Sequence, residues 1–293
     1  MITPIEYDNS MDGDAGADML DVTYPMPHIA GDSVGGFWTE SAGSWLHIDE
    51  DDTATRRFNL DGEKAFLRVR GISAMDSSTL VVSGHVDGER EGGLWLFDTT
   101  AMTWTPIATD ASIVGDVAVV GRTVFYVEIL YDAVGDISFV VRRLDDATAD
   151  PIVTPQLDVD DGERVKLSVT PDLSVIADTG SRLLAIDSAG EVSQLSEFPA
   201  GTPVTTTTTA GTTAWATAPR VTDESWYVDG GSSDARRVIE TNEFCDPRSI
   251  ETSQREVSPP LCNIQAMEWV DANTLIVSAG TEGGSILAKL RMP

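Results

Sequence analysis

The hydrophobic and polar positions of residues 65–109 follow the period-two alternation of short β-strands. This stretch holds four β-type runs bounded by turn-forming Asp, Ser, Thr and Gly residues: LRVRGISAM, TLVVSGHV, GLWLFDT and MTWTPIA. Short turns between such runs are typical of strands that pair with their neighbours in the chain. The pattern therefore predicts a four-stranded antiparallel meander over these residues.

The same pattern recurs along the chain, and such repeats decide the fold. Further units lie at residues 33–60, with a short inner strand near residues 28–33, and at 113–155, 163–198, 202–241 and 263–292. The last unit has only three runs, whereas an unassigned β-type run, MLDVTYPM, lies at residues 19–26. We predict that this N-terminal run supplies the missing outer strand of the last unit.

Four-stranded units of about 35–45 residues are typical of β-propeller blades. We predict an all-β fold, a β-propeller of six four-stranded blades closed by the N-terminal strand, which would protect the open sheet edges. Five or seven blades remain alternatives. The propeller would span residues 18–293, and residues 1–17 would form a flexible acidic leader or tether.

The unit at 163–198 carries a resemblance to a known superfamily. Its segment SVTPDLSVIADTGSRLLAIDSAGEV resembles the repeats of six-bladed propellers of the TolB and NHL types. Leu173 stands where such repeats usually have Gly, and no Trp-Asp dipeptide closes the units. The resemblance implies the fold, and we carry over no functional residues from it.

The charge of the chain is strongly negative, with 19 basic against 48 acidic residues and a net charge of −29. Nucleic-acid and anionic-membrane partners need a positive surface, so both are excluded as expected partners. A negative surface keeps copies of a protein apart, and we expect a monomer. It can also attract cations or a basic partner.

The two cysteines, Cys245 and Cys262, enclose the longest connection between units, residues 242–262. We predict a disulfide between them that fixes this connection, with two independent thiols as the alternative. A disulfide implies export from the reducing cytosol. We therefore expect an extracytoplasmic protein, secreted or tethered to the envelope as a lipoprotein would be, although residues 1–17 are no signal peptide.

The longer loops, including residues 84–93, 129–136 and 218–225, are predicted to lie on one face together with residues 242–262. Long loops on a rigid scaffold favour binding. We regard seven residues on or beside these loops as the candidate binding face, each with a solvated surface residue as its alternative: His85, Asp87, Arg90, Asp132, Arg220, Asp223 and Trp226.

Motifs for catalysis and metal binding are weak. The three histidines, His28, His47 and His85, fall in different units, which argues against a zinc centre. Calcium is conceivable at the acidic stretches 8–14 and 158–163, but solvated turns explain both. The chain has no G-x-S-x-G elbow and no phosphate-binding glycine loop, and we predict no catalytic residues and no cofactor.

Three functions remain open at this point. The first is non-catalytic binding or scaffolding at the cell envelope, with a protein or carbohydrate partner held on the long-loop face. The second is a propeller enzyme, a metal-dependent lyase or hydrolase that acts on a sugar or lactone. The third is an extracytoplasmic sensor domain.

Overall fold

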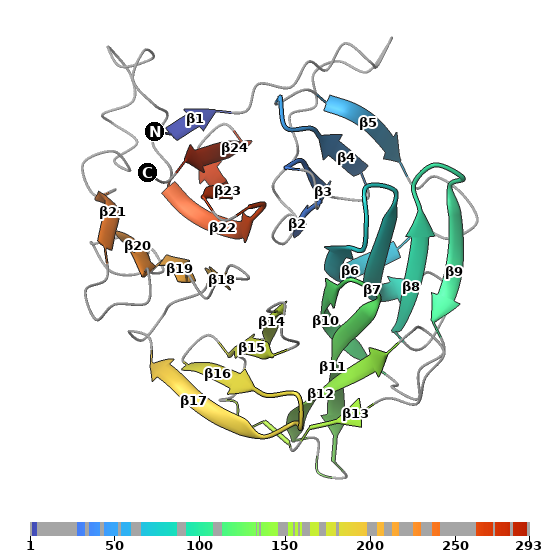
Figure 1. The fold of residues 1–293 in the computed structure, drawn as a ribbon. Coiled ribbons are helices and arrows are strands. Elements are labelled where there is room, and N and C mark those ends of the chain that lie inside the picture. Colours follow the sequence, from blue (N-terminus) through green and yellow to red (C-terminus); the bar gives the residue numbers. More distant parts are fainter. Residues whose placement is uncertain are drawn as a thin grey trace. The chain divides into compact units, whose positions relative to one another are not determined.

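A computed structural model describes the strands of the chain and part of its turns. Its described residues are 2–4, 28–32, 35–41, 44–51, 54–59, 66–86, 92–107, 113–145 without 133 and 135, 152–197 without 155, 158, 160–164, 170–173 and 180–181, then 204–207, 213–216, 225–229, 236–240 and 262–291 without 272 and 282–283. Within these ranges the chain forms β-strands and no helix, arranged as six four-stranded antiparallel sheets (Figure 1). The chain divides into two compact units, residues 60–200 and residues 1–59 with 201–293.

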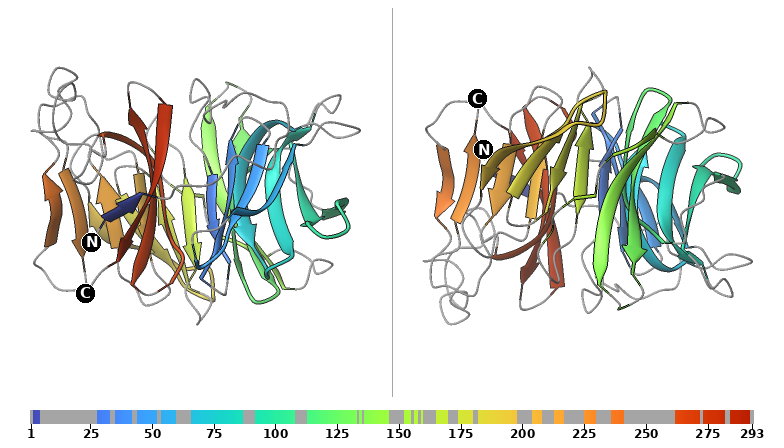
Figure 2. Two further views of the ribbon diagram at one scale, coloured as in Figure 1. Left: turned by 90° about the horizontal axis from the view of Figure 1, so that it is seen from above. Right: turned by 90° about the horizontal axis from the view of Figure 1, so that it is seen from below.

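The unit of residues 60–200 consists of three consecutive meanders. Its strands are β6 (Phe66–Ala74), β7 (Thr79–Val86), β8 (Gly93–Asp98) and β9 (Thr103–Ile107); β10 (Val114–Val120), β11 (Thr123–Tyr131), β12 (Ile137–Asp145) and β13 (Ile152–Val153); and β14 (Lys166–Val169), β15 (Val175–Asp178), β16 (Arg182–Ile186) and β17 (Val192–Glu197). The first strand of each meander packs against the first strand of the next, so that β10 lies between β6 and β14. Figure 2 shows these strands from the side, with the turns at their ends.

The second unit joins both ends of the chain. Its sheets are β18 (Val204–Thr207), β19 (Thr213–Ala216), β20 (Ser225–Asp229) and β21 (Arg236–Glu240); β22 (Cys262–Trp269), β23 (Thr274–Thr281), β24 (Gly284–Arg291) and β1 (Ile2–Pro4); and β2 (His28–Gly31), β3 (Phe37–Ser41), β4 (Ser44–Ile48) and β5 (Ala54–Asn59). Here β22 contacts both β18 and β2, so the sheet made from the two chain ends is the middle one.

Burial explains why the strands of middle sheets carry long apolar runs. In β11 every residue from Val124 to Glu128 is buried, so both faces of the strand are covered. One apolar cluster joins β10–β12 to the preceding sheet and includes Val81, Leu94 and Tyr126, and another joins the same strands to the following sheet and includes Phe125, Val141 and Leu184. A sheet between two others thus needs apolar residues on both faces, and strict alternation is lost.

These sheets confirm the predicted all-β class and the four-stranded antiparallel units. The meander predicted at residues 65–109 is the sheet of β6 to β9, and the short inner strand near residues 28–33 is β2. In the described residues, no helix is long and apolar enough to cross a membrane.

The strand that completes the last sheet is not the one we predicted. Ile2–Pro4 pairs antiparallel with β24, with Ile2 opposite Leu290 and Pro4 opposite Ala288. Residues 2–4 thus form an edge strand inside the predicted leader 1–17, and the leader itself stays a prediction. A proline is tolerated here because an edge strand needs no donor on its open side. The run at residues 19–26 lies outside the described residues.

Deletion of residues 1–4 tests the contribution of this edge strand. We expect the midpoint of thermal unfolding to fall by about 2–5 °C and aggregation on heating to increase, because β24 would expose its hydrogen-bonding edge. Calorimetry and size-exclusion chromatography measure both. Deletion of residues 12–14, which belong to no described strand, serves as the control and should leave the midpoint unchanged; equal behaviour of the two deletions would contradict the assignment.

Candidate functional site

The inner strand β10 is irregular at its start. Its register with β11 shifts between Val114 and Val117, which leaves Gly115 and Asp116 outside the regular ladder as a β-bulge. Bulges redirect side chains and are frequent beside functional sites. Its position in the bulge makes Asp116 a candidate site residue.

The Asp116 carboxylate reaches across to the next sheet. Its Oδ2 accepts a hydrogen bond of 2.8 Å from the backbone N–H of Leu167 in β14. Burial raises the pKa of Asp116 to about 6, although the Leu167 N–H and the nearby charge of Lys166 act in the opposite direction. Burial therefore outweighs both opposing contributions, and the pKa of the Asp116 carboxyl group lies near neutrality.

On its other side, Asp116 packs directly against the backbone of β6. A Cβ atom added to Gly71 would lie 2.4 Å from Asp116 Oδ1 and 2.8 Å from the Val117 nitrogen. Only glycine leaves room for this approach. The carboxylate thus lies between β6 and β14 and connects three neighbouring inner strands.

Ser83 of β7 contacts the bulge of β10 and the backbone of β6. Its buried hydroxyl donates to the Gly115 carbonyl at 2.5 Å, with the Gly71 carbonyl 3.4 Å away. A second serine, Ser73 of β6, accepts a hydrogen bond of 3.0 Å from the Val119 N–H of β10. These contacts lock the bulge of β10 onto the preceding sheet.

Ser83 belongs to a wider pattern of buried polar residues. Where the side chains of second strands are described, each such strand carries one or more buried polar residues in addition to its apolar ones, among them Thr39, Ser83, Glu128, Asp178 and Ser278. Glu128 accepts a hydrogen bond from Arg142 Nε at 2.5 Å, and its side chain is 4% exposed. A buried carboxylate paired in this way is stabilised by its partner and is not presented to a substrate.

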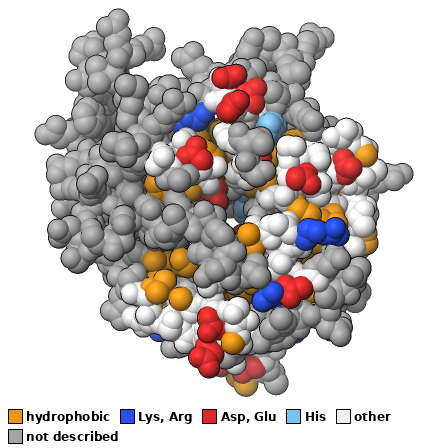
Figure 3. Space-filling view, viewed as in Figure 1, with side chains coloured by type: hydrophobic (Ala, Val, Ile, Leu, Met, Phe, Trp, Pro, Cys, Tyr) orange, Lys and Arg blue, Asp and Glu red, His pale blue; other side chains and the backbone are white. Residues whose placement is uncertain are grey.

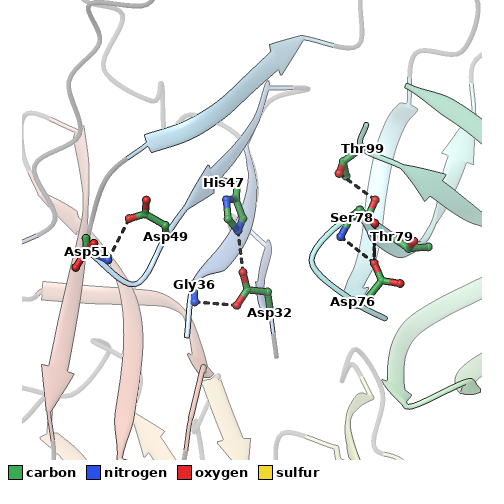
Figure 4. Close-up of polar contacts among 9 residues, drawn as sticks. All are labelled: Asp32, Gly36, His47, Asp49, Asp51, Asp76, Ser78, Thr79 and Thr99. Atoms are coloured by element: carbon green, nitrogen blue, oxygen red, sulfur yellow. Dashed lines mark hydrogen bonds and ion pairs between the residues drawn. The ribbon is translucent and has the colours of Figure 1, made fainter. Parts of the chain in front are cut away.

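In the other unit, Asp32 and His47 form a comparable pair (Figure 4). Asp32 Oδ2 lies 2.8 Å from His47 Nε2, and Asp32 Oδ1 accepts a hydrogen bond of 2.8 Å from the Gly36 N–H. The Asp32 side chain is fully buried, and the His47 ring lies against Trp38 at a centroid distance of 4.6 Å. The pair fixes the turn between β2 and β3 to the third strand of the sheet.

Several other aspartates stabilise turns. Asp76 Oδ1 accepts hydrogen bonds from the N–H groups of Ser78 and Thr79 at 2.8 Å (Figure 4). Partial burial raises the pKa of Asp76, but the hydrogen bonds from Ser78 and Thr79 outweigh it and hold the pKa below its ordinary value. The same contact to a backbone N–H two residues further on recurs at Asp49, Asp98, Asp132, Asp187 and Asp271. Some of the many aspartates of the chain therefore stabilise its turns.

Of the seven residues of the predicted binding face, three are placed. His85 lies inside β7 opposite Arg68, and Trp226 lies inside β20 opposite Ala216, so both belong to strands. Asp132 lies at the tip of the β11–β12 hairpin and is exposed. Asp87, Arg90, Arg220 and Asp223 lie outside the described residues, and their role stays a prediction.

The predicted disulfide also stays untested. Cys262 is the first residue of β22, whereas Cys245 lies outside the described residues. The acidic stretches considered for calcium fall almost entirely outside them as well. Among the residues that the structure describes, no three His, Cys, Asp or Glu side chains converge to hold a metal ion.

Comparison with solved structures identifies the fold, whereas no protein-family profile and no curated protein matches the sequence. A streptogramin B lyase matches with a TM-score of 0.54 and 10% identity over 94% of this chain and 97% of its own. A protein provisionally assigned as a gluconolactonase matches with a TM-score of 0.58 and 13% identity over 96% and 93%. Regucalcin, a calcium-binding protein from Agrobacterium tumefaciens, matches with a TM-score of 0.53 and 13% identity over 93% and 92%.

This protein therefore has a β-propeller fold. At these identities the likeness shows the fold alone. The finer resemblance to TolB-type and NHL-type repeats and the count of six blades stay predictions.

Gly71→Ala tests the close approach of β6 and β10. We expect a loss of about 3 kcal/mol of unfolding free energy, because the added methyl group would overlap backbone atoms that cannot move independently. Denaturant unfolding measures the change. Gly121→Ala is the control, since its Cβ would meet nothing within 4 Å and the variant bears only the strain of a φ of +59°, about 1 kcal/mol. Similar losses for both variants would contradict the packing argument.

Asp116→Asn tests the perturbed carboxyl group. An acid whose pKa is raised by folding favours the folded state when protonated, so this contribution is present below pH 3.8 and is lost as the pH rises through about 6. Relative to the wild type, the variant should gain on the order of 2 kcal/mol between about pH 4 and pH 7, since asparagine still accepts from Leu167 without a charge. Denaturant unfolding across this range measures the free energy of unfolding of both proteins. If the two free energies changed with pH in parallel, the raised pKa of Asp116 would be contradicted.

Proposed function

We propose that the protein is a non-catalytic binding or scaffolding propeller of the extracytoplasmic space. One observation supports this most strongly: the polar side chains that the described residues bring together are bonded to other parts of the fold. Asp116 bonds Leu167, Ser83 bonds Gly115 and Glu128 bonds Arg142. The first two contacts connect neighbouring sheets and the third connects two strands of one sheet, whereas catalytic groups must meet a substrate.

The compartment is part of the proposal. It is supported by the predicted Cys245–Cys262 disulfide, which requires an oxidising environment. We further propose that the partner is a protein or carbohydrate of the envelope. We also propose a monomer, because a net charge of −29 keeps copies of the protein apart.

A propeller enzyme is the second candidate, because one specific observation favours it. The Asp116 carboxyl group, at the bulge of β10, has a pKa of about 6, which suits a general acid or base near neutral pH. The fold is also similar to those of a streptogramin B lyase and a provisionally assigned gluconolactonase. In this case the substrate would be a sugar or lactone and the protein would need a divalent metal.

A lactone-opening assay separates the two candidates. Purified protein is incubated with glucono-δ-lactone and Ca²⁺, Mg²⁺, Mn²⁺ or Zn²⁺, and acid release is followed in a pH-stat. We expect no rate above the buffer background and no change in thermal unfolding when EDTA is added. Metal-dependent turnover that is lost in Asp116→Asn and kept in Ser73→Ala would overturn the non-catalytic function.

A further inference from the structure

The exposed apolar side chains are concentrated on one hairpin. Seven large apolar residues are exposed in the described part of the chain, and four of them lie within the β11–β12 hairpin. We call these four the apolar tip: Leu130 (36% exposed), Tyr131 (55%), Val134 (85%) and Ile137 (49%). Isolated exposed apolar residues are normal, whereas a cluster of them marks an interaction surface.

This hairpin extends beyond the rest of its sheet. The last contacts of β11 with the β10 side involve Glu128, which pairs with Val114, and Ile129, whose N–H donates to the Ile113 carbonyl. On the other edge, the last partner of β12 is Leu157, which bridges Phe139. From Leu130 to Ser138 the described chain is therefore a two-stranded ribbon, and its backbone pairs only with itself.

The described residues of the ribbon are held by hydrogen bonds within the ribbon. Tyr131 pairs with Ile137, so their side chains lie on the same face of the ribbon. Asp132 closes the turn, because its Oδ1 accepts from Val134 N–H at 2.8 Å and from Asp136 N–H at 2.9 Å, while its own N–H donates to the Asp136 carbonyl at 3.0 Å. A preformed tip loses little conformational entropy on binding.

The charge of the tip indicates what it binds. Residues 129–138 include Asp132 and Asp136 but no Lys, Arg or His, and both aspartates are exposed. Figure 3 shows acidic side chains spread over the described surface, with few basic ones among them. A complementary partner surface would bring Lys or Arg next to these carboxylates and an apolar depression for the four side chains.

Other occupants fit this charge less well. A second copy docked tip to tip would bring its own two aspartates against the first pair, in a protein of net charge −29. Ribbons or helices that enter a bilayer surface usually carry basic residues beside their apolar ones. A carboxylate pair at the tip opposes both arrangements.

We propose that the β11–β12 hairpin is the docking element of this protein, and that its apolar tip inserts into an apolar depression rimmed by Lys and Arg on a basic protein partner. This inference rests on the proposed binding function and specifies the kind of partner. Tyr131 would be the central contact, since aromatic residues in a well-packed pocket dominate binding energy.

Three fluorescent synthetic peptides of equal length test the proposal by anisotropy at 0.15 M salt: an amphipathic Leu/Lys peptide, a Ser/Lys peptide of the same charge, and a Leu/Glu peptide. We expect the wild-type chain to bind the Leu/Lys peptide at least tenfold more tightly than the other two. The triple variant Tyr131→Ser, Val134→Ser, Ile137→Ser should lose this advantage. The matched variant Met102→Ser, Val192→Ser, Leu195→Ser, which removes exposed apolar groups elsewhere, should keep it within twofold.

A second variant separates charge from apolar contact. Asp132→Asn with Asp136→Asn keeps the Oδ1 acceptor at residue 132, and we expect it to weaken Leu/Lys binding severalfold and to reduce its salt dependence. Thermal unfolding checks that all variants remain folded.

Several outcomes would overturn the inference. The first is an equal loss of affinity for the Leu/Lys peptide in the tip variant and in its matched control, and the second is binding of the Leu/Glu peptide as tight as that of the Leu/Lys peptide. The others are a dimer of the wild type that the tip variant abolishes, and binding to phosphatidylcholine vesicles that depends on the tip. Failure here leaves the non-catalytic binding function standing, because that function is decided by the lactone assay.

Discussion

Within each of the two units, the structure depends on the packing of an inner strand against the inner strand of the neighbouring sheet. Where β6 meets β10, the approach is so close that Gly71 has no room for a side chain and the Asp116 carboxylate fills the remaining space. Because the sheets stack face to face, a strand such as β11 is covered on both sides and becomes apolar on both. The hydroxyl of Ser83 donates to the Gly115 carbonyl in the bulge of β10, since backbone groups left outside the ladder need partners.

Aspartate has two uses in this fold, and they explain much of its abundance. At turns, a short carboxylate accepts from the backbone two residues further on, as Asp76 does, and its pKa is held low. Between sheets, Asp116 sits where burial outweighs its hydrogen bond, and its pKa is raised. The same residue type therefore differs in protonation behaviour according to whether water or protein surrounds it.

The sequence alone was sufficient to predict the strands but not the contacts between sheets. Period-two alternation and turn residues located the meander of β6 to β9, because both signals are local. Asp116 is visible in the sequence only as one polar residue within an apolar run, and its partner Leu167 is 51 positions away. The β1 strand was missed because three residues are too few to show an alternation.

The division of the chain has a consequence for its synthesis. Residues 60–200 form a unit from one continuous segment, whereas β2 to β5 pack against β22, which belongs to the last part of the chain to be made. The ribosome must add the 202 residues from 60 to 261 before β22 begins, which takes roughly 10–40 s at about 5–20 residues per second. During that interval the apolar face of β2 to β5 has no partner. The continuous unit can complete its sheets first, and the N-terminal strands are then the part of the nascent chain that most needs protection from aggregation.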